Sequence, residues 1–509
     1  MSRETTAAGG GLPTGVAEIA DAVRSGAVSA ESVARRTLGI IEERNERLGA
    51  YLHVDGGGLL EAARKLDARR ERGDKLGPLA GVPVGLKDAL ATADMPTTAG
   101  SRILVHRGKG WMAPYDAAVV ARLRAADALL PGKCNLDELA MGSSTENSAF
   151  FPSRNPLDES RTPGGSSGGS AVSVASGMTP AALGSDTGGS IRQPAAFTGI
   201  VGVKPTYGRV SRYGLVAFAS SLDQVGPFAS DVRGAARLLG VLAGHDPRDA
   251  TSLAAPVPDY EAACTGEVAG LRIGIPDEYF GEGLDAAVGA SVRDALARLE
   301  RAGATLVPVS LPHTKYAVAT YYVLATAEAS SNLSRFDGVR FGLREEPRRG
   351  DLDAMYEATR GAGFGPEVRR RVLLGTYVLS AGYYDAYYRK AQRVRTRIAE
   401  DFVAVLGGSS ATLPARVDLL AAPTTPTPAF LLGENAQDPL AMYLGDLLTL
   451  PPSLAGLPAM SVPIDPTPPT DERPALPVGL QLIGPALGEP VLFRVASAVE
   501  RLLRGTSAS

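Results

Sequence analysis

The residues best suited to chemistry lie in two turns rich in glycine and serine, one at residues 164–169 and one that ends at Ser190. A serine that follows glycines can sit in a sharp turn, with its hydroxyl exposed and several backbone N–H groups directed at one point. The N–H groups of Thr187, Gly188 and Gly189 would be those donors. The pattern predicts a nucleophilic hydroxyl beside an oxyanion hole.

A flexible linker is the other interpretation of a glycine and serine cluster, because such a segment has few side chains to bury. Apolar runs resume at once, however, at residues 171–175 and 180–183. Such runs are typical of segments that face a core. We therefore expect the glycines to shape the backbone beside a site.

A serine hydroxyl is a weak nucleophile and requires a base. Histidine is the usual base, but none of the four histidines lies in a cluster of functional residue types: His53, His106, His245 and His313. Lysine is the alternative, because burial disfavours its charged form and a neutral amine accepts a proton. Lys87 follows the largely apolar run 78–86, which would carry it inward from a strand end. A solvated lysine beside Asp88 is the commoner fate of such a pair, and composition alone leaves both interpretations open.

Three separated motifs resemble the amidase signature family of serine hydrolases and occur in the family's order. They are Lys87-Asp88, GGSSGGS at residues 164–170 and GSDTGGSIRQPAAF at residues 184–197. The resemblance implies a triad in which Ser190 is the acyl-forming nucleophile, Ser166 relays the proton and Lys87 is the base. It also implies a cis peptide bond at Ser166, and an α/β fold with a single α/β/α sandwich around a mixed β-sheet.

Four further segments are similar to one branch of this family, the glutamine-hydrolysing subunits of the tRNA-dependent amidotransferases: residues 132–150, 206–228, 244–252 and 334–342. This similarity extends from about residue 12 to about residue 503. It implies that the chain is a glutaminase, which hydrolyses glutamine and releases ammonia.

Free glutamine carries an α-carboxylate and an α-ammonium, so a selective site needs one cation and one anion placed apart. The branch's pattern puts Arg371 at the carboxylate-binding position and Asp446 at the amine-binding position. It puts Tyr321 or Tyr322 over the pocket. Without that pattern, the basic run 369–371 would be interpreted as a solvated face of a helix.

The loop at residues 143–147 contains serine, threonine, glutamate and asparagine side chains. On residue type it is equally well a polar pocket wall or a solvated turn. The resemblance favours the wall of an active site.

The resemblance also implies partners. Ammonia would pass to a B subunit, where ATP and Mg²⁺ activate Glu-tRNA(Gln), and a small C subunit would hold the two together. We expect no cofactor or metal in this chain, and contact with the tRNA mainly through the B subunit. Whether Asp-tRNA(Asn) is also a substrate stays open.

Two alternative functions remain. The first is a free-standing amidase that acts on another amide, which would have no use for the charge pair Arg371 and Asp446. The second is a scaffold protein without activity, which the complete triad disfavours.

The elements that would position these residues alternate between strand and helix. Hydrophobic periodicity predicts strands at residues 82–86, 129–130, 271–275 and 305–309, strand-like segments around Val210 and Val216, and helices at 29–48, 59–72, 117–126, 231–242 and 286–302. A crossover unit over 271–309 predicts one continuous mixed sheet.

The length of 509 residues favours two to four domains. The resemblance overrides this, and we expect one domain over residues 1–509. Within it we expect N-terminal helices over about 12–75, a signature core over about 78–245 and a glutamine-specificity region over about 270–503. Residues 407–416 and 465–474 are expected to be surface loops.

Composition fits a globular protein with a large core, with 44% hydrophobic and 21% charged residues. The net charge of −3 argues against a strongly basic nucleic-acid surface. Two cysteines, Cys134 and Cys264, exclude a disulfide framework and a cysteine-only zinc site. With no signal peptide or membrane-spanning run recognised, we expect a cytoplasmic protein without membrane contact.

Overall fold

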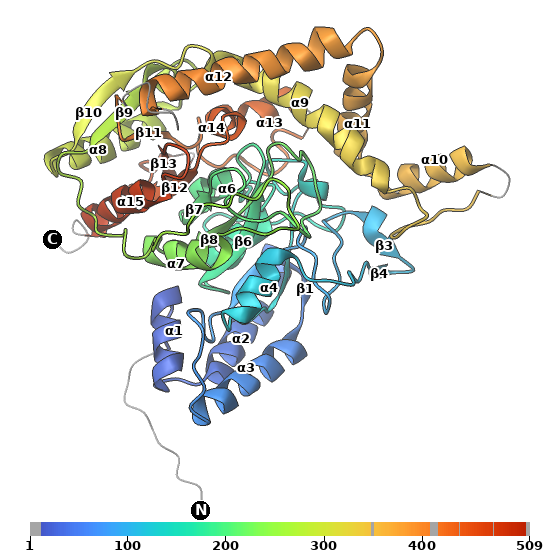
Figure 1. Cartoon of the computed structure of the whole chain (residues 1–509), viewed down its shortest axis with the longest axis horizontal. Helices are drawn as coiled ribbons and strands as arrows, with labels where there is room; N and C mark the ends of the chain where they lie inside the picture. Colours follow the sequence, from blue (N-terminus) through green and yellow to red (C-terminus); the bar gives the residue numbers. More distant parts are fainter. Residues whose placement is uncertain (1–11, 348–350, 408–415, 437, 472, 505–509) are drawn as a thin grey trace, which may run out of the picture.

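A mixed β-sheet runs through the middle of the molecule, and helices cover both of its faces (Figure 1). The structure is a computed structural model that describes residues 12–347, 351–407, 416–436, 438–471 and 473–504. Within these residues the sheet has eleven strands, in the spatial order β1 (Tyr51–Val54), β5 (Gly132–Cys134), β2 (Val84–Lys87), β6 (Ala181–Asp186), β8 (Gln224–Ala229), β7 (Val201–Lys204), β12 (Ala459–Ile464), β13 (Val478–Ile483), β11 (Leu419–Pro423), β9 (Arg272–Pro276) and β10 (Thr305–Val309). A separate hairpin joins β3 (Val105–His106) to β4 (Lys109–Gly110).

The sheet combines parallel and antiparallel pairing. β2 lies parallel to both β5 and β6, and β9 lies parallel to both β10 and β11. Antiparallel pairing joins β6, β8, β7, β12, β13 and β11 in turn. The early and late parts of the chain therefore meet inside one sheet, where β7 pairs with β12.

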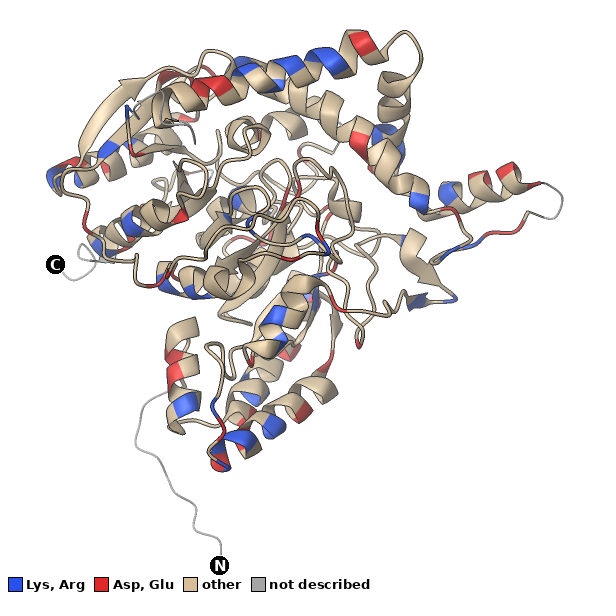
Figure 2. Ribbon diagram, in the orientation of Figure 1, with Lys and Arg blue, Asp and Glu red and all other residues tan. Residues whose placement is uncertain are grey.

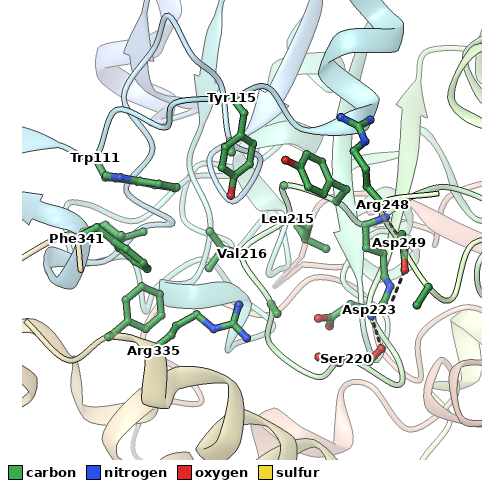
Figure 3. Close-up of a pocket in the computed structure, with 18 residues that line it drawn as sticks. Trp111, Tyr115, Leu215, Val216, Ser220, Asp223, Arg248, Asp249, Arg335 and Phe341 are labelled. Carbon is green, nitrogen blue, oxygen red and sulfur yellow. Dashed lines mark hydrogen bonds and ion pairs between the residues drawn. The ribbon is translucent and has the colours of Figure 1, made fainter. Parts of the chain in front are cut away.

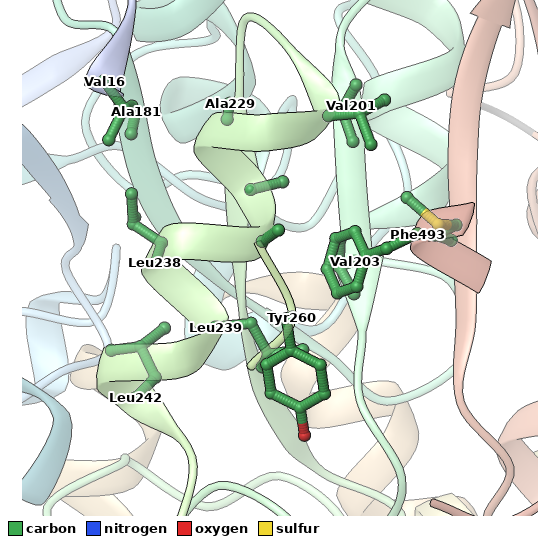
Figure 4. Close-up of a cluster of buried hydrophobic side chains, with 14 of the residues drawn as sticks. Val16, Ala181, Val201, Val203, Ala229, Leu238, Leu239, Leu242, Tyr260 and Phe493 are labelled. Carbon is green, nitrogen blue, oxygen red and sulfur yellow. The ribbon is translucent and has the colours of Figure 1, made fainter. Parts of the chain in front are cut away.

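Alternate residues of the strands enter opposite apolar layers, as the pleat of a strand requires. In β11, Leu419 and Ala421 join one buried cluster, whereas Leu420 and Ala422 join the other. Figure 4 shows part of the first cluster, where side chains of α7 (Val232–Leu242) pack beside strand residues such as Ala229 and Val203. The predicted α/β/α sandwich is confirmed.

Helices of the first layer include α1 (Val16–Ser25), α4 (Ala118–Ala125), α7, α8 (Ala286–Arg301) and α15 (Glu489–Arg504), extended by α2 (Ala30–Leu48) and α3 (Gly56–Glu71). The opposite face carries α5 (Gly168–Ala175), α6 (Arg192–Thr198), α9 (Ala317–Asn332), α11 (Pro366–Leu379), α12 (Lys390–Leu406) and α14 (Leu450–Leu454). The short helix α13 (Pro439–Leu444) packs on α9 through Tyr443, whose ring stacks on that of Tyr322. Helix α10 (Leu352–Gly363) projects from the body (Figure 1).

Most of the predicted elements are confirmed. The Ser29 side chain accepts a hydrogen bond of 3.1 Å from the Ser32 N–H and caps α2, and β9, α8 and β10 form the predicted parallel crossover unit. α3 begins at Gly56, three residues before the prediction, because Asp55 caps it by accepting from the Gly58 N–H.

Three segments predicted as strands do not form strands. The segment 129–130 forms only an isolated bridge between Leu129 and Pro83, and β5 begins beyond Pro131, which has no N–H for a strand ladder. The segments around Val210 and Val216 are loops. Gly208 and Gly214, with φ of 81° and 84°, turn the chain there.

The two predicted surface loops have different outcomes. Residues 408–415, nearly all of the first, lie outside the described residues. The described residues of 465–474 link β12 to β13 without helix or strand and are mostly exposed, as predicted. Among the helices of the described residues, none combines the length and apolar character needed to cross a membrane.

Candidate active site

Lys87 is the last residue of strand β2, and its side chain points into the interior, where it is fully buried. Its Nζ donates hydrogen bonds to three serine hydroxyls, at 2.7 Å to Ser166, 2.8 Å to Ser167 and 3.0 Å to Ser185. The interpretation of Lys87 as a solvated lysine is therefore wrong. A lysine held by three hydroxyls can exchange protons with them.

Burial makes the Lys87 amine easier to deprotonate. Burial lowers the pKa of Lys87 to about 7, even though the nearby carboxylates of Asp137, Asp186 and Asp223 raise it. A large fraction of this amine is thus uncharged near pH 7 and able to accept a proton.

The first glycine-serine turn fits tightly against its surroundings. The peptide bond between Gly165 and Ser166 is cis, as the resemblance implies. The Gly165 N–H donates to the Gln193 side-chain oxygen at 2.9 Å, and a Cβ on Gly165 would lie 2.1 Å from an oxygen of Asp137. Only glycine fits there, so the turn is a packed part of the site and the linker interpretation is wrong.

The second turn places Ser190 directly after β6. Ser190 is 8% exposed, and within the described residues its hydroxyl forms no hydrogen bond. Among those residues, the N–H groups of 187–190 also find no protein acceptor, whereas the next two, of Ile191 and Arg192, donate to Asp186. The turn therefore leaves backbone donors free beside an accessible hydroxyl, which is what an oxyanion hole needs.

A buried carboxylate supports this turn from behind. The Thr187 hydroxyl donates to Asp223 at 2.7 Å, and burial raises the pKa of Asp223 to about 6.

Asp223 also lines a neighbouring pocket of about 350 Å³. Aromatic and arginine side chains line the same pocket, among them Trp111, Tyr115, Arg248, Arg335 and Phe341 (Figure 3).

A buried ion pair ties the same turn to the late part of the chain. Arg192 and Asp186 lie 2.9 Å apart and both side chains are fully buried. Arg192 donates further to the Thr449 carbonyl, the Gln481 side chain and the Ser453 hydroxyl, at 2.9, 2.7 and 2.8 Å. The nucleophile turn is thereby fixed against α14 and β13.

Arg371 lies on the inner face of α11 and is buried, so the interpretation of residue 371 as part of a solvated helix face is wrong. Its Nε donates to Glu367 at 2.7 Å, and its guanidinium lies 5.4 Å from the ring centres of both Tyr322 and Tyr443. Within the described residues the two terminal nitrogens form no hydrogen bond. They are therefore available for a ligand carboxylate.

Asp446 is buried beside the nucleophile turn. One carboxylate oxygen accepts from the Ser143 hydroxyl at 2.5 Å, and the other is buried without a partner among the described residues. A Cβ on Gly189 would lie 3.3 Å from that free oxygen. Burial raises the pKa of Asp446 to about 7. An unpaired buried oxygen is costly unless a ligand donates to it, as an ammonium would.

Both tyrosines named from the sequence lie at this site, from adjacent positions of α9. Tyr321 lies against the nucleophile turn, since a Cβ on Gly188 would be 2.9 Å from its ring. Tyr322 stacks on Tyr443 with 3.8 Å between ring centres. The structure thus brings every residue predicted for the site into one region, and the buried residues 143–145 form part of its wall.

Some residues of this site were missed by the sequence analysis. Ser167 and Ser185 stand inside the recognised motifs, and Glu367 precedes Arg371 by one helical turn, a spacing that signals an ion pair. Asp137, which accepts from the Thr145 N–H at 2.8 Å, had no signal of its own.

The profile of the amidase family matches residues 32–493, and the chain belongs to this family. Among named relatives, it is 56% identical over 481 residues to the A subunit of the glutamyl-tRNA(Gln) amidotransferase of Chloroflexus aggregans, covering 94% of each chain. The crystal structure of the A subunit of the glutamyl-tRNA(Gln) amidotransferase from Thermotoga maritima superposes with a TM-score of 0.74 at 42% identity, over 93% of this chain and 91% of that one. The peptide amidase from Stenotrophomonas maltophilia gives a TM-score of 0.78 at 32% identity, over 96% and 97% of the two chains.

Proposed function

We propose that this chain is the glutaminase subunit of a glutamyl-tRNA(Gln) amidotransferase. The observation that carries this proposal is the buried pair of Arg371 and Asp446, each with unused hydrogen-bonding groups, beside the Lys87 and Ser190 region. Free glutamine has the two charges that such a pair would bind. Relatives of that name, 53–56% identical over nearly the full chain, support the same conclusion.

In the mechanism we propose, Ser190 attacks the side-chain amide carbon of glutamine. Ser166 takes the proton of the Ser190 hydroxyl and passes its own to the uncharged amine of Lys87. The N–H groups of Thr187, Gly188 and Gly189 stabilise the negative charge on the amide oxygen.

The second half of the reaction returns that proton. The Lys87 ammonium donates through Ser166 to the nitrogen of the leaving group, so that the C–N bond breaks and ammonia departs. Water then attacks the acyl-enzyme, its proton passes back along the same path, and glutamate leaves. The three oxygen acceptors around Nζ stabilise the transient ammonium.

Substrate selection falls to the other end of the site. Arg371 would hold the α-carboxylate through its two terminal nitrogens, Asp446 would accept from the α-ammonium, and Tyr321 would close the pocket over the reacting amide. Tyr322 would keep Arg371 in place by packing on its guanidinium.

We further propose a single catalytic domain in a cytoplasmic heterotrimer. Ammonia would pass to a B subunit that uses ATP and Mg²⁺ to activate Glu-tRNA(Gln), with a small C subunit bound to both. The described residues of this chain hold no group of three or more potential metal ligands.

One assay tests this proposal: ammonia release from glutamine, with and without the B and C subunits and charged tRNA. The expected result is glutamine hydrolysis and, in the complete mixture with ATP, formation of Gln-tRNA(Gln). Hydrolysis of simple aryl amides without glutamine hydrolysis would indicate a free-standing amidase. A complex that forms but releases no ammonia would indicate a scaffold.

A further inference from the structure

Helix α11 exposes large apolar side chains to solvent in addition to burying an inner face. Its inner face is buried at Val368, Arg371, Gly375 and Val378. Its outer face carries the exposed side chains Leu373, Leu374 and Tyr377. The outer face of a helix in a globular protein is normally polar, so these three side chains need an explanation.

The exposed apolar surface continues into the π-helical segment Tyr384–Arg389 that follows α11. The Tyr377 ring lies 4.3 Å from that of Tyr383 and 6.2 Å from that of Tyr387. We define the tyrosine patch as six side chains that are 40–71% exposed: Leu373, Leu374, Tyr377, Tyr383, Tyr384 and Tyr387. Contiguous exposed apolar side chains mark interaction sites, and tyrosine is enriched where such contacts contribute most.

Basic residues outnumber acidic ones around the tyrosine patch, which gives it a basic rim. From residue 367 to residue 400 the sequence has three acidic residues, Glu367, Asp385 and Glu400, and each forms an ion pair with one exposed arginine of the same stretch. Six exposed basic residues lie in the same stretch: Arg369, Arg370, Arg389, Lys390, Arg393 and Arg397. Figure 2 shows several of them as blue bands along α12, next to the π-helical segment. A complementary surface would be apolar at its centre and acidic around it.

We propose that the tyrosine patch is the docking surface for another subunit of the amidotransferase, one that presents an apolar surface with an acidic rim. This inference rests on the proposed function, which requires partners. A second copy of this chain fits poorly, because two basic rims would face each other and repel.

A partner bound to this patch would affect the glutamine site through α11, because Arg371 projects from the opposite face of the same helix. α11 also packs closely on α9, because a Cβ on Gly375 would lie 1.9 Å from the Thr326 carbonyl oxygen. α9 carries Tyr321 and Tyr322. A bound partner therefore restrains both helices that line the glutamine pocket, and the KM for glutamine is lower in the complex than in the free chain.

The test uses the full chain with purified B and C subunits and compares two matched leucines. Leu373→Asp places a charge in the tyrosine patch, whereas Leu352→Asp changes a leucine of α10 that is 56% exposed and lies outside it. Leu373→Asp should raise the Kd for the partner subunits at least about tenfold. It should also return the KM for glutamine to the value of the free chain. Leu352→Asp should change neither. Because both leucines are exposed, both variants should keep the Tm of the wild type. Tyr384→Ser, a milder change in the patch, should raise the Kd by a smaller factor than Leu373→Asp does.

The possible results separate the two proposals. A wild-type chain that binds no partner subunit would overturn the proposed function together with this docking surface. A wild-type complex that Leu373→Asp and Tyr384→Ser leave intact would overturn the docking surface alone. Dimers of the free chain that Leu373→Asp dissociates would assign the patch to a second copy instead.

Discussion

The Lys87 cluster and the glutamine end of the site differ in how far the protein itself satisfies their polar groups. At the catalytic end, Lys87 donates to three serine hydroxyls, and its partners Ser167 and Ser185 are hydrogen-bonded to each other. At the glutamine end, an oxygen of Asp446 has no partner among the described residues, and Arg371 uses only its Nε. The protein alone satisfies the Lys87 amine, whereas the glutamine end and the free N–H groups beside Ser190 gain their hydrogen bonds from the substrate.

This difference separates catalysis from recognition. Groups that are satisfied by the protein hold one geometry before substrate arrives, which favours the transition state. Groups left unsatisfied gain most of their hydrogen bonds only when the ligand binds. Changes at the catalytic end should therefore affect kcat, and changes at the glutamine end should affect KM.

The largest effect is expected from Ser190→Ala and Lys87→Met, since either removes a member of the proposed proton path. Glutamine hydrolysis should fall by about 10⁴-fold or more, measured as ammonia release, because members of such a unit act together. The Tm and the equilibrium binding of glutamine should stay near the wild-type values, which would show that the pocket persists. Appreciable hydrolysis by Ser190→Ala would remove Ser190 as the nucleophile.

Arg371→Met should come next, with an increase in the KM for glutamine of about 100-fold, since a charge-assisted hydrogen-bonded pair with the α-carboxylate is lost. The kcat should change much less. Arg370→Met is the matched control, because Arg370 occupies the neighbouring position of α11 but is exposed. An unchanged KM in Arg371→Met would exclude this arginine from the carboxylate site.

The pH dependence of kcat/KM tests the two ends of the site together, because Lys87 and Asp446 titrate in the same pH range. Burial lowers the pKa of Lys87 to about 7 and raises that of Asp446 to about 7. As pH falls through 7, Lys87 gains a proton and loses its role as base, and Asp446 gains a proton and loses its attraction for the α-ammonium. The wild-type kcat/KM should therefore fall with a slope of up to two protons, and that of Asp446→Asn with a slope of one. Identical slopes would mean that Asp446 does not titrate with the reaction.

The smallest effect is expected from Ser185→Ala, which removes one of the acceptors of Lys87. Hydrogen bonds to the ammonium favour the charged form, so the pKa of Lys87 should fall and the acidic limb of the kcat profile should move to lower pH. The kcat itself should change by less than about tenfold, because two serine hydroxyls remain. A steady-state pH profile of ammonia release measures both quantities.

The sequence predicted the catalytic end better than its surroundings, and particular residues explain why. The turns around Ser166 and Ser190 require glycine and small side chains in consecutive positions, so their chemistry and geometry are visible as short motifs. Arg371 and Asp446 stand in helical and loop segments of ordinary composition, and only the resemblance singled them out. The support from Asp137 and Asp223 depends on loops that fold back on each carboxylate, and no short motif records that geometry.

The strand predictions were also accurate only where local sequence determines the structure. β10 was placed at its observed bounds because its apolar and β-branched residues dominate locally. β5 was misplaced because its start depends on pairing with β1, where a Cβ on Gly132 would lie 2.1 Å from the His53 carbonyl oxygen. Pairing with a distant strand, rather than local hydrophobicity, selected glycine at that position.

The seam between β7 and β12 has a consequence for any attempt to divide the chain. A fragment that ends after α7 would keep the whole lysine and serine cluster yet leave Gly202 and Val203 on an open, apolar strand edge. Unpaired edges of this kind recruit other chains into aggregates. Minimal versions of this enzyme made by truncation are therefore expected to precipitate, and shortening should be confined to surface connections such as 465–474.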